Sequence, residues 1–232
     1  MSFQREPISE GSMRRSPVEP DLTTRGAHWS RLGDARLATR LNLDGTGATV
    51  TLCDLSPLGL VGVKGPQSST WLAQRGLLVP EAIYQTTRLP DGGVVGRLGQ
   101  EEFMVGGGTN LDFVTSIVQD LRASADLPYC LEREDASFLL AGDGSLAALA
   151  QTCGVDFRAA AEDQLVLTRV AGVSCTILPQ HRHDRASWRL WCDPSFATYL
   201  WGQLTTIVED LDGCVVGAYH CIDTRNTTEP AS

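Results

Sequence analysis

The chain has 232 residues, 42% of them hydrophobic, and a formal net charge of −9. This charge argues against a general nucleic-acid-binding protein, because phosphate binding requires a surplus of Lys and Arg. No apolar stretch approaches the roughly 20 residues of a membrane-spanning helix, and residues 1–25 contain no apolar segment typical of a signal peptide. We therefore expect a cytoplasmic protein that binds neither nucleic acid nor a membrane.

The seven cysteines agree with a reducing compartment. Their number is odd, they form no CxxC pair, and most lie in apolar runs such as Val173–Leu178. We interpret them as buried, reduced thiols that act as small apolar side chains.

Composition and periodicity divide the chain into four segments. Residues 1–25 lack apolar periodicity and are expected to form a flexible N-terminal arm, and residues 223–232 a flexible tail. Between them a similar order of strands and helices occurs twice. This repeat predicts a first half over residues 26–125 and a second half over residues 126–222.

In the first half, alternating β-rich segments predict strands, and apolar residues at helical spacing predict helices. Asn110 is positioned as a helix N-cap and Gly76 as the residue that ends a helix. The expected elements are strands over Ala48–Leu55 and Leu60–Lys64, a helix over Gln67–Arg75, a hairpin of Val94–Leu98 and Glu102–Val105 turning at Gly99-Gln100, and a helix over Leu111–Ala123.

The second half repeats this order. Its expected elements are strands over Tyr129–Arg133 and Ser137–Ala141, a helix over Ser145–Cys153, a hairpin of Gln164–Arg169 and Val173–Leu178 turning at Ala171-Gly172, a strand over Trp188–Cys192, and a long helix that starts at Pro194 after the cap residue Asp193. Two β-α-β-β-α units in succession predict an α+β fold of two similar, mostly antiparallel, ferredoxin-like halves, each sheet covered by helices on one face.

Familiar catalytic and cofactor motifs are missing from the sequence. It contains neither GxxxxGK[ST] nor GxSxG, and Gly92-Gly93 lead into a strand, which favours a turn over a dinucleotide loop. His181 and His183 are the only close histidine pair, but they lie in an arginine-rich segment expected to be a solvated loop. Because further ligands are missing there, we expect no metal site.

Carboxylates near expected strand ends or turns are the remaining polar candidates: Asp54, Asp91, Glu101, Glu102 and Asp156. At such positions a carboxylate can act as a general base or a ligand. It can equally cap a turn. Both interpretations stay open, and no residue is assigned a catalytic role.

Several motifs together resemble a known family. Asp54–Gly59, Val61–Pro66 and Trp71-Leu72 resemble the opening of the glycine-cleavage aminomethyltransferase and folate-binding family. Gly96–Phe103 is similar to a stretch of one branch, the gamma subunit of heterotetrameric sarcosine oxidase. The resemblance continues in the second half over Cys153–Phe157, Leu167–Val173 and Asp193–Trp201, so that it extends from about Thr49 to Leu211.

This resemblance implies an aminomethyltransferase-like folate-binding fold, here without the C-terminal barrel of the full transferase. It implies a small, gamma-like subunit of a multisubunit amine N-demethylating oxidoreductase, with an assembly or scaffolding role and no cofactor of its own. Tetrahydrofolate, FAD or FMN, and NAD are then expected on the partners, a large subunit and a flavin-bearing subunit. The alternative is a stand-alone tetrahydrofolate-binding protein that handles one-carbon units.

Three polar residues and four tryptophans are the site candidates. Asp54, Arg97 and Glu101 could line a folate pocket or be structural. For Arg97 we expect a structural ion pair with Glu101 or Glu102 across the hairpin turn. Tryptophan is favoured at interface anchors, although each one could also belong to the core. The interface candidates are Trp71, Trp188, Trp191 and Trp201.

Overall fold

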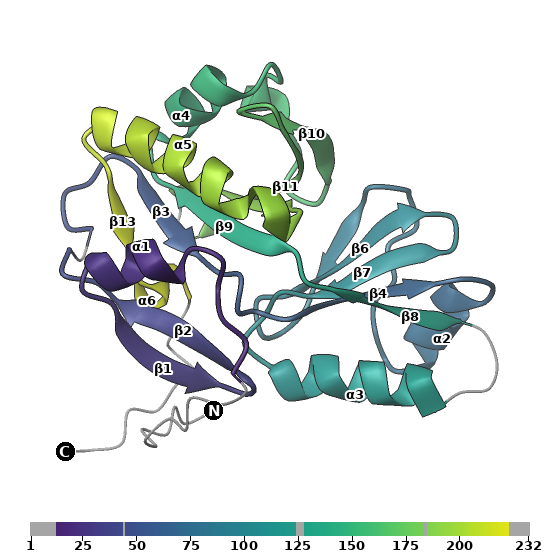
Figure 1. The fold of residues 1–232 in the computed structure, drawn as a ribbon. Helices are drawn as coiled ribbons and strands as arrows, with labels where there is room; N and C mark the ends of the chain where they lie inside the picture. Colours follow the sequence, from purple (N-terminus) through teal and green to yellow (C-terminus); the bar gives the residue numbers. More distant parts are fainter. Residues whose placement is uncertain (1–12, 44, 124–127, 183–184, 223–232) are drawn as a thin grey trace.

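A computed structural model of the chain describes residues 13–43, 45–123, 128–182 and 185–222. Two large sheets lie at an angle to each other, with helices on the faces that are turned apart (Figure 1). The elements are, in chain order, α1 (Glu19–Thr24), β1 (His28–Leu32), β2 (Ala35–Arg40), β3 (Thr51–Asp54), β4 (Leu60–Lys64), α2 (Ser68–Gln74), β5 (Thr86–Arg88), β6 (Val94–Gly99), β7 (Glu102–Gly106), α3 (Leu111–Ala123), β8 (Tyr129–Arg133), β9 (Ala136–Ala141), α4 (Ser145–Thr152), the 3-10 helix η1 (Phe157–Ala159), β10 (Val166–Val170), β11 (Val173–Arg182), β12 (Arg185–Cys192), the 3-10 helix η2 (Pro194–Phe196), α5 (Ala197–Asp210), β13 (Cys214–Val216) and α6 (Ala218–Cys221).

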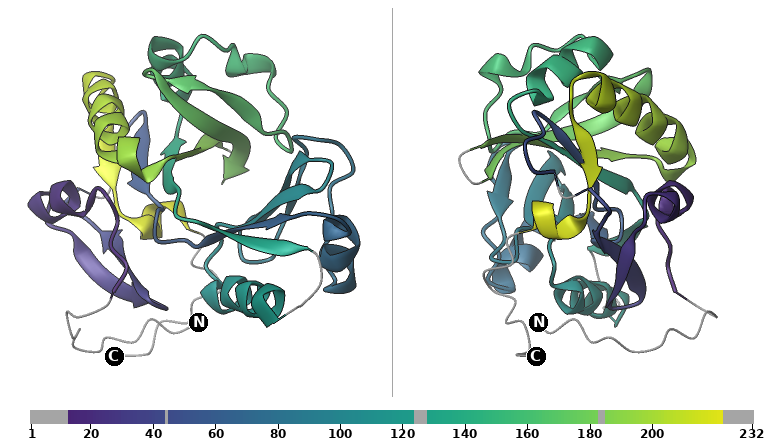
Figure 2. Two further views of the ribbon diagram at one scale, coloured as in Figure 1. Left: turned by 45° about the vertical axis from the view of Figure 1, so that its right-hand side comes forward. Right: turned by 90° about the vertical axis from the view of Figure 1, so that its left-hand side faces the viewer.

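The larger sheet has six strands in the order β10-β11-β12-β9-β3-β13. Its pairings are antiparallel except for β13 with β3, which is parallel. The hairpin of β10 and β11 turns at the expected Ala171-Gly172, where both residues have positive φ. Helices α4 and α5 lie against one face of this sheet, as the two views of Figure 2 also show. Phe138 and Leu190 of the sheet are buried in one apolar cluster with Leu200 of α5.

The second sheet has five antiparallel strands in the order β5-β6-β7-β4-β8. Helix α3 has the predicted bounds, and its N-terminus is capped as expected, because the backbone N–H of Phe113 donates to Asn110 Oδ1 at 3.1 Å. Ile117 and Leu121 of α3 pack with Val63 and Phe103 of the sheet. The predicted α+β class with mostly antiparallel sheets is therefore confirmed.

The sheets do not divide the chain at residues 125 and 126, where we expected one half to end. Strand β3 comes from the first half but lies in the six-stranded sheet, and β8 comes from the second half but lies in the five-stranded sheet. The chain therefore crosses between the sheets twice, after Asp54 and after Arg133. Backbone pairing joins the two crossings, since Leu55 N donates to Ser137 O at 2.8 Å. Each sheet takes strands from both halves, so the halves are interlocked.

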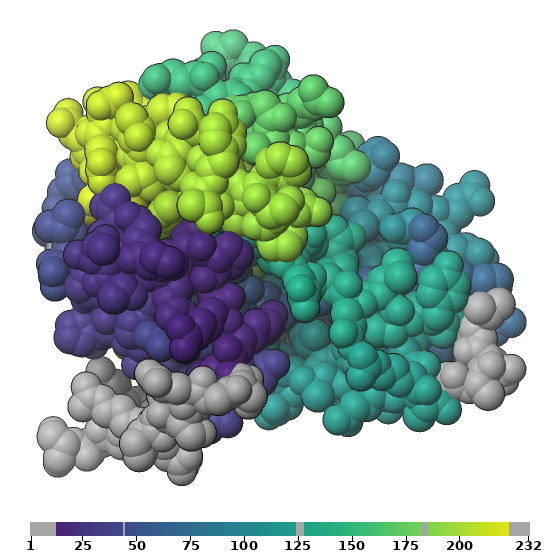
Figure 3. Space-filling view, viewed as in Figure 1, coloured from purple at the N-terminus to yellow at the C-terminus, as the bar shows by residue number. Residues whose placement is uncertain are grey.

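The expected flexible arm is wrong for its described part. Residues 19–24 form α1, and Leu22 of this helix is buried. Trp201 Nε1 of α5 donates to Asp21 Oδ2 at 2.7 Å, so a long-range contact fixes this helix, and Figure 3 shows the two segments in contact at the surface. The rest of the arm, residues 1–12, and the tail at residues 223–232 lie outside the described residues.

The sequence analysis also missed the β1–β2 hairpin. Ala35 and Leu37 of β2 are fully buried, and Leu37 shares a cluster with Leu139 and Val216 of the six-stranded sheet. No helix in the described part of the chain is long and apolar enough to span a membrane.

Candidate functional site

Asp54 lies at the end of β3, where the chain first crosses between the sheets. Its Oδ1 accepts from the hydroxyl of Ser56 at 2.6 Å and from the backbone N–H of Ser56 at 3.0 Å. Burial raises the pKa of this carboxyl, while hydrogen bonds from Ser56 and Ser16 act in the opposite direction. Ser56 Oγ in turn accepts from Ser137 N at 3.0 Å, which ties the two crossings together. Through these contacts Asp54 is bonded to the segment that joins the two sheets.

Arg97 on β6 binds backbone oxygens. Its guanidinium donates to the carbonyls of Gly99 at 3.1 Å, Pro80 at 3.2 Å, Glu81 at 2.8 Å and Gln100 at 2.7 Å. The expected structural role agrees with these contacts, but the expected carboxylate partner is wrong. The hairpin turn presents its carbonyl oxygens to the guanidinium.

The neighbouring acids have other contacts. Glu102 pairs with Lys64 at 2.8 Å, and Glu101 is exposed, with its backbone oxygen accepting from Gly65 N at 2.9 Å. Arg97 and Glu101 lie at the Gly99 end of the five-stranded sheet. Asp54 leads into β4 at the other end, where Leu60 pairs with Gly106. The structure therefore does not bring the three predicted pocket residues together.

Instead, a buried polar cluster that the sequence analysis missed lies between the sheets. Arg189 on β12 is 1% exposed. Its Nε donates to Ser137 Oγ at 2.9 Å and its Nη1 to the carbonyl of Gly107, while its guanidinium lies 5.0 Å from the ring centre of Trp191. The sequence does contain a signal for this arginine. Arg189 stands between Trp188 and Leu190, and because side chains alternate along a strand, it lies on the face opposite to those two apolar side chains.

The Gly107 carbonyl belongs to a glycine turn between β7 and α3. Gly107 has a φ of +77°, and a Cβ atom there would lie 3.1 Å from Arg189 Nη1. Asp91 holds this turn, because its Oδ2 accepts from Asn110 N at 2.9 Å and its Oδ1 from Gly93 N at 3.1 Å. The carboxylate of Asp91 thus acts as a turn cap, one of the two roles that the sequence left open.

Apolar side chains fill the adjoining space between the sheets. The five-stranded sheet and the segments facing it contribute a common cluster of buried residues: Leu60, Val94, Met104, Leu165, Leu178 and Trp191. All of them are less than 9% exposed. At this place the chain's own side chains occupy the inter-sheet region.

Three of the four proposed interface tryptophans belong to the core. Trp188, Trp191 and Trp201 are 5%, 2% and 3% exposed, so an anchoring role in a partner interface is wrong for them. Trp188 Nε1 donates to Ser145 Oγ at 2.9 Å. Trp71 is half-buried beneath the guanidinium of Arg75, which lies 3.3 Å from its ring centre.

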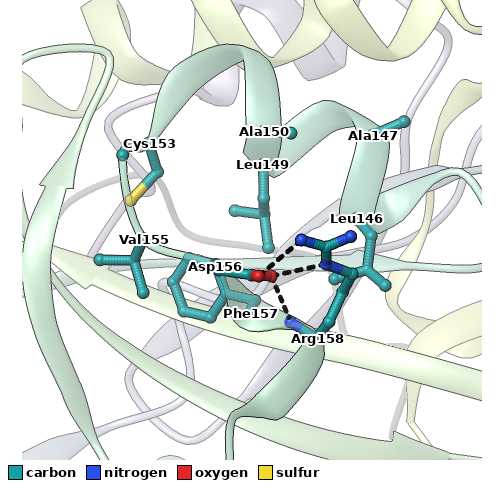
Figure 4. Close-up of a pocket in the computed structure, with 10 residues that line it drawn as sticks. Leu146, Ala147, Leu149, Ala150, Cys153, Val155, Asp156, Phe157 and Arg158 are labelled. Atoms are coloured by element: carbon teal, nitrogen blue, oxygen red, sulfur yellow. Dashed lines mark hydrogen bonds and ion pairs between the residues drawn. The ribbon is translucent and has the colours of Figure 1, made fainter.

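A surface pocket of about 500 Å³ lies between α4 and the segment that follows it (Figure 4). Leu149 and Phe157 are among its apolar lining residues, and Asp156 and Arg158 lie side by side in the same view. Arg158 donates to Asp156 through Nε at 2.8 Å and Nη2 at 2.6 Å. These bonds lower the pKa of Asp156 to about 2. Asp156 also caps η1 through Arg158 N, so its contacts are structural.

A smaller hollow of about 140 Å³ lies beside the two crossings and has lining groups of both charges, including Arg14, Arg15, Glu134 and Asp135. Among the described residues, no group of three His, Cys, Asp or Glu side chains is arranged to hold a metal ion. His181 lies in β11 and pairs with Glu162 at 2.7 Å, so the expected loop at this residue is wrong, while His183 lies outside the described residues.

Comparison with known proteins identifies the fold. No protein-family model matches the sequence, and a search of curated proteins finds no match. Among solved structures, the glycine cleavage system aminomethyltransferase T from Bartonella henselae matches with a TM-score of 0.70 at 19% identity. The chain has an aminomethyltransferase-like fold. The match covers 90% of this chain and 61% of the transferase, so the chain spans less than two thirds of that protein's length.

A second structure shares this aminomethyltransferase-like fold. A chain of the heterotetrameric sarcosine oxidase from Corynebacterium sp. U-96 matches with a TM-score of 0.66 at 18% identity. Here the match covers 86% of this chain and 96% of that chain. The resemblance inferred from the sequence motifs is confirmed at the level of the fold.

Proposed function

We propose that this chain is a small, gamma-like subunit of a cytoplasmic, sarcosine-oxidase-type complex that oxidatively demethylates an amine. In this proposal the chain contributes assembly and scaffolding. A large subunit carries tetrahydrofolate and NAD, and a further subunit carries FAD or FMN. The identity of the amine depends on those subunits.

The observation that carries the proposal is the packing between the two sheets. A folate-binding protein needs a central pocket with polar groups positioned around it. In this chain Arg189, Trp191 and Met104 fill part of the inter-sheet region and are each at most 2% exposed. Arg189 is engaged with Ser137 and with the Gly107 carbonyl. Such packing favours a scaffolding role over folate binding by this chain.

The fraction of each similar solved structure that this chain covers supports the same proposal. The likeness extends over 96% of the matched chain of sarcosine oxidase but 61% of the aminomethyltransferase. That sarcosine oxidase is a heterotetramer. A scaffolding subunit in such an assembly has to keep its shape without a bound cofactor, and the apolar cluster between the sheets allows this.

Co-expression tests the proposal. The chain is produced together with candidate large and flavin-bearing subunits, and the mixture is analysed by affinity capture and size-exclusion chromatography. We expect stable co-elution, and amine-dependent activity that is lower when this chain is omitted. If the chain elutes alone while the other subunits form a fully active complex without it, the proposal is wrong.

Fluorescence titration of the purified chain with tetrahydrofolate distinguishes the proposed subunit from the alternative, a stand-alone folate-binding protein. The five tryptophans, all buried or half-buried, provide the signal, and an intact aminomethyltransferase serves as the positive control. We expect no saturable change at folate concentrations that saturate the control. Saturable binding would favour a stand-alone folate-binding protein.

A further inference from the structure

The two large sheets end in edge strands that differ in how accessible they are. Strands β5 and β13 have three residues each, and Thr86 N of β5 donates to Asp163 O at 2.6 Å. The segment that enters β10 is held by Leu165 N, which donates to Tyr84 O at 2.6 Å. Strand β8 has five residues and, in the described part of the chain, pairs only with β4. Strand β10 is equally long, but the residue before it is bonded to the segment that leads into the other sheet, whereas no described residue flanking β8 makes such a backbone bond.

Strand β8 also exposes large apolar side chains. Tyr129 and Leu131 are 45% and 40% exposed, and they share one face because they are two residues apart on a strand. The residue of β4 opposite Leu131 is Gly62, which has no side chain to cover it. An exposed edge that carries apolar side chains is prone to pair with another strand.

We propose that β8 is a self-association edge, on which a second copy of this chain adds its own β8 in antiparallel orientation. The sequence Tyr129–Arg133 is complementary to itself when Leu131 faces its counterpart on the twofold axis. In that register Tyr129 faces Arg133 of the second copy, which allows a cation–π contact. Cys130 faces Glu132, so no two like charges stand directly opposite each other.

Neighbouring residues favour this register over two shifted ones. Pro128 precedes β8 and has no N–H to donate, so pairing that extends before Tyr129 would lose hydrogen bonds. A shift that centres the pairing on Glu132 would place two carboxylates opposite each other, which is destabilising. In the proposed register Glu132 keeps its ion pair with Arg122 of its own chain.

The result is an isologous dimer in which two five-stranded sheets form one continuous sheet. The α3 helices, which lie against β8 within each copy, then come to the same side of this sheet. The association does not use the inter-sheet cluster on which the proposed function rests, so the two proposals succeed or fail separately.

Size-exclusion chromatography with light scattering over a range of protein concentrations tests the proposal with the full chain. We expect the wild type to show a concentration-dependent dimer. Leu131→Lys places two ammonium groups at the axis and should raise the dissociation constant about tenfold or more. The matched control is Leu167→Lys on edge strand β10, where the leucine is 52% exposed. This control should leave the dimer unchanged.

Cross-linking tests the register. In a Cys130→Ser background, Leu131→Cys should give a covalent dimer with a short bifunctional thiol cross-linker, because the two Cβ atoms would lie about 4.5–5.5 Å apart. Leu167→Cys in the same background should not. A wild type that is monomeric at every concentration overturns the proposal, as does equal loss of the dimer in both lysine variants. If the wild type alone is monomeric and Leu131→Lys prevents capture by the co-expressed subunits, a partner's strand occupies β8 and the self-association is wrong.

Discussion

Replacing Arg97 by Met tests whether one guanidinium holds the far end of the five-stranded sheet. Arg97 connects β6 with the segment at Pro80 and Glu81 and with the hairpin turn at Gly99 and Gln100. Methionine retains an apolar stem beside the ring of Phe103 but cannot donate a hydrogen bond. The substitution therefore removes the four contacts and changes the packing little.

The expected loss follows from where these bonds lie. Those to Gly99 and Pro80 are partly buried, whereas those to Glu81 and Gln100 are exposed, where water can replace the donor. A net intramolecular hydrogen bond contributes about 0.5–1.5 kcal/mol. Counting the partly buried pair over the full range and the exposed pair at the lower limit, we expect Arg97→Met to lower the free energy of unfolding by about 2–4 kcal/mol.

Urea unfolding monitored by tryptophan fluorescence measures this difference. Arg88→Met is the matched control, because Arg88 lies on the neighbouring strand β5 and forms an exposed ion pair with Glu162 at 3.1 Å. A pair of this kind contributes about 0–1 kcal/mol. If the two variants lose the same stability, the guanidinium does not hold this end of the sheet. If Arg97→Met folds normally but abolishes folate binding or the activity of the complex, Arg97 is a functional residue and the scaffolding proposal is wrong.

Three further predictions concern a cap, a turn and two carboxylates. Asn110→Ala should lower the free energy of unfolding by about 1 kcal/mol, measured in urea, because Phe113 N loses its cap. Gly107→Ala should cost about 1–3 kcal/mol from its positive φ. In urea its cost should exceed that of Gly172→Ala, where φ is also positive but no atom lies within 4 Å of the added Cβ; equal costs would show that Arg189 does not crowd residue 107. Asp54→Asn and Asp156→Asn should differ in the sign of their pH dependence in unfolding experiments. The pKa of Asp54 is raised by burial, so wild-type stability relative to Asp54→Asn should fall as pH rises from below 3.8 through the raised value. The pKa of Asp156 is lowered to about 2, so stability relative to Asp156→Asn should be present above 3.8 and lost as pH falls through 2. Parallel profiles would contradict this reasoning.

Local signals explain the elements that were predicted with correct bounds. Leu111–Ala123 has apolar residues at helical spacing and the cap residue Asn110 directly before it. Leu60–Lys64 and Tyr129–Arg133 also have their predicted bounds as β4 and β8. In contrast, α1 is short and lacks periodicity, and its position depends on the bond from Trp201, which is 180 residues distant from Asp21.

The candidate site was less predictable than the fold. The motif at Asp54 marked the crossing between the sheets, but nothing near it in the sequence indicates that Ser16 and Ser137 complete its surroundings. Arg97 was expected to be structural, and its contacts agree with that expectation. Its partners are backbone oxygens, which every residue possesses and which no sequence pattern can identify.

The sequence by itself determined the α+β class, the order of most strands and helices, the cap at Asn110 and the turn at Ala171-Gly172, because each depends on residues within about one turn or one hairpin. Only the tertiary structure decided which sheet each strand joins. Pairing of β3 with β9 and of β4 with β8 connects residues far apart in the chain. That exchange places Arg189 beside Gly107 and leaves Tyr129 and Leu131 on a free edge, and periodicity cannot predict this, because a strand has the same alternation in either sheet.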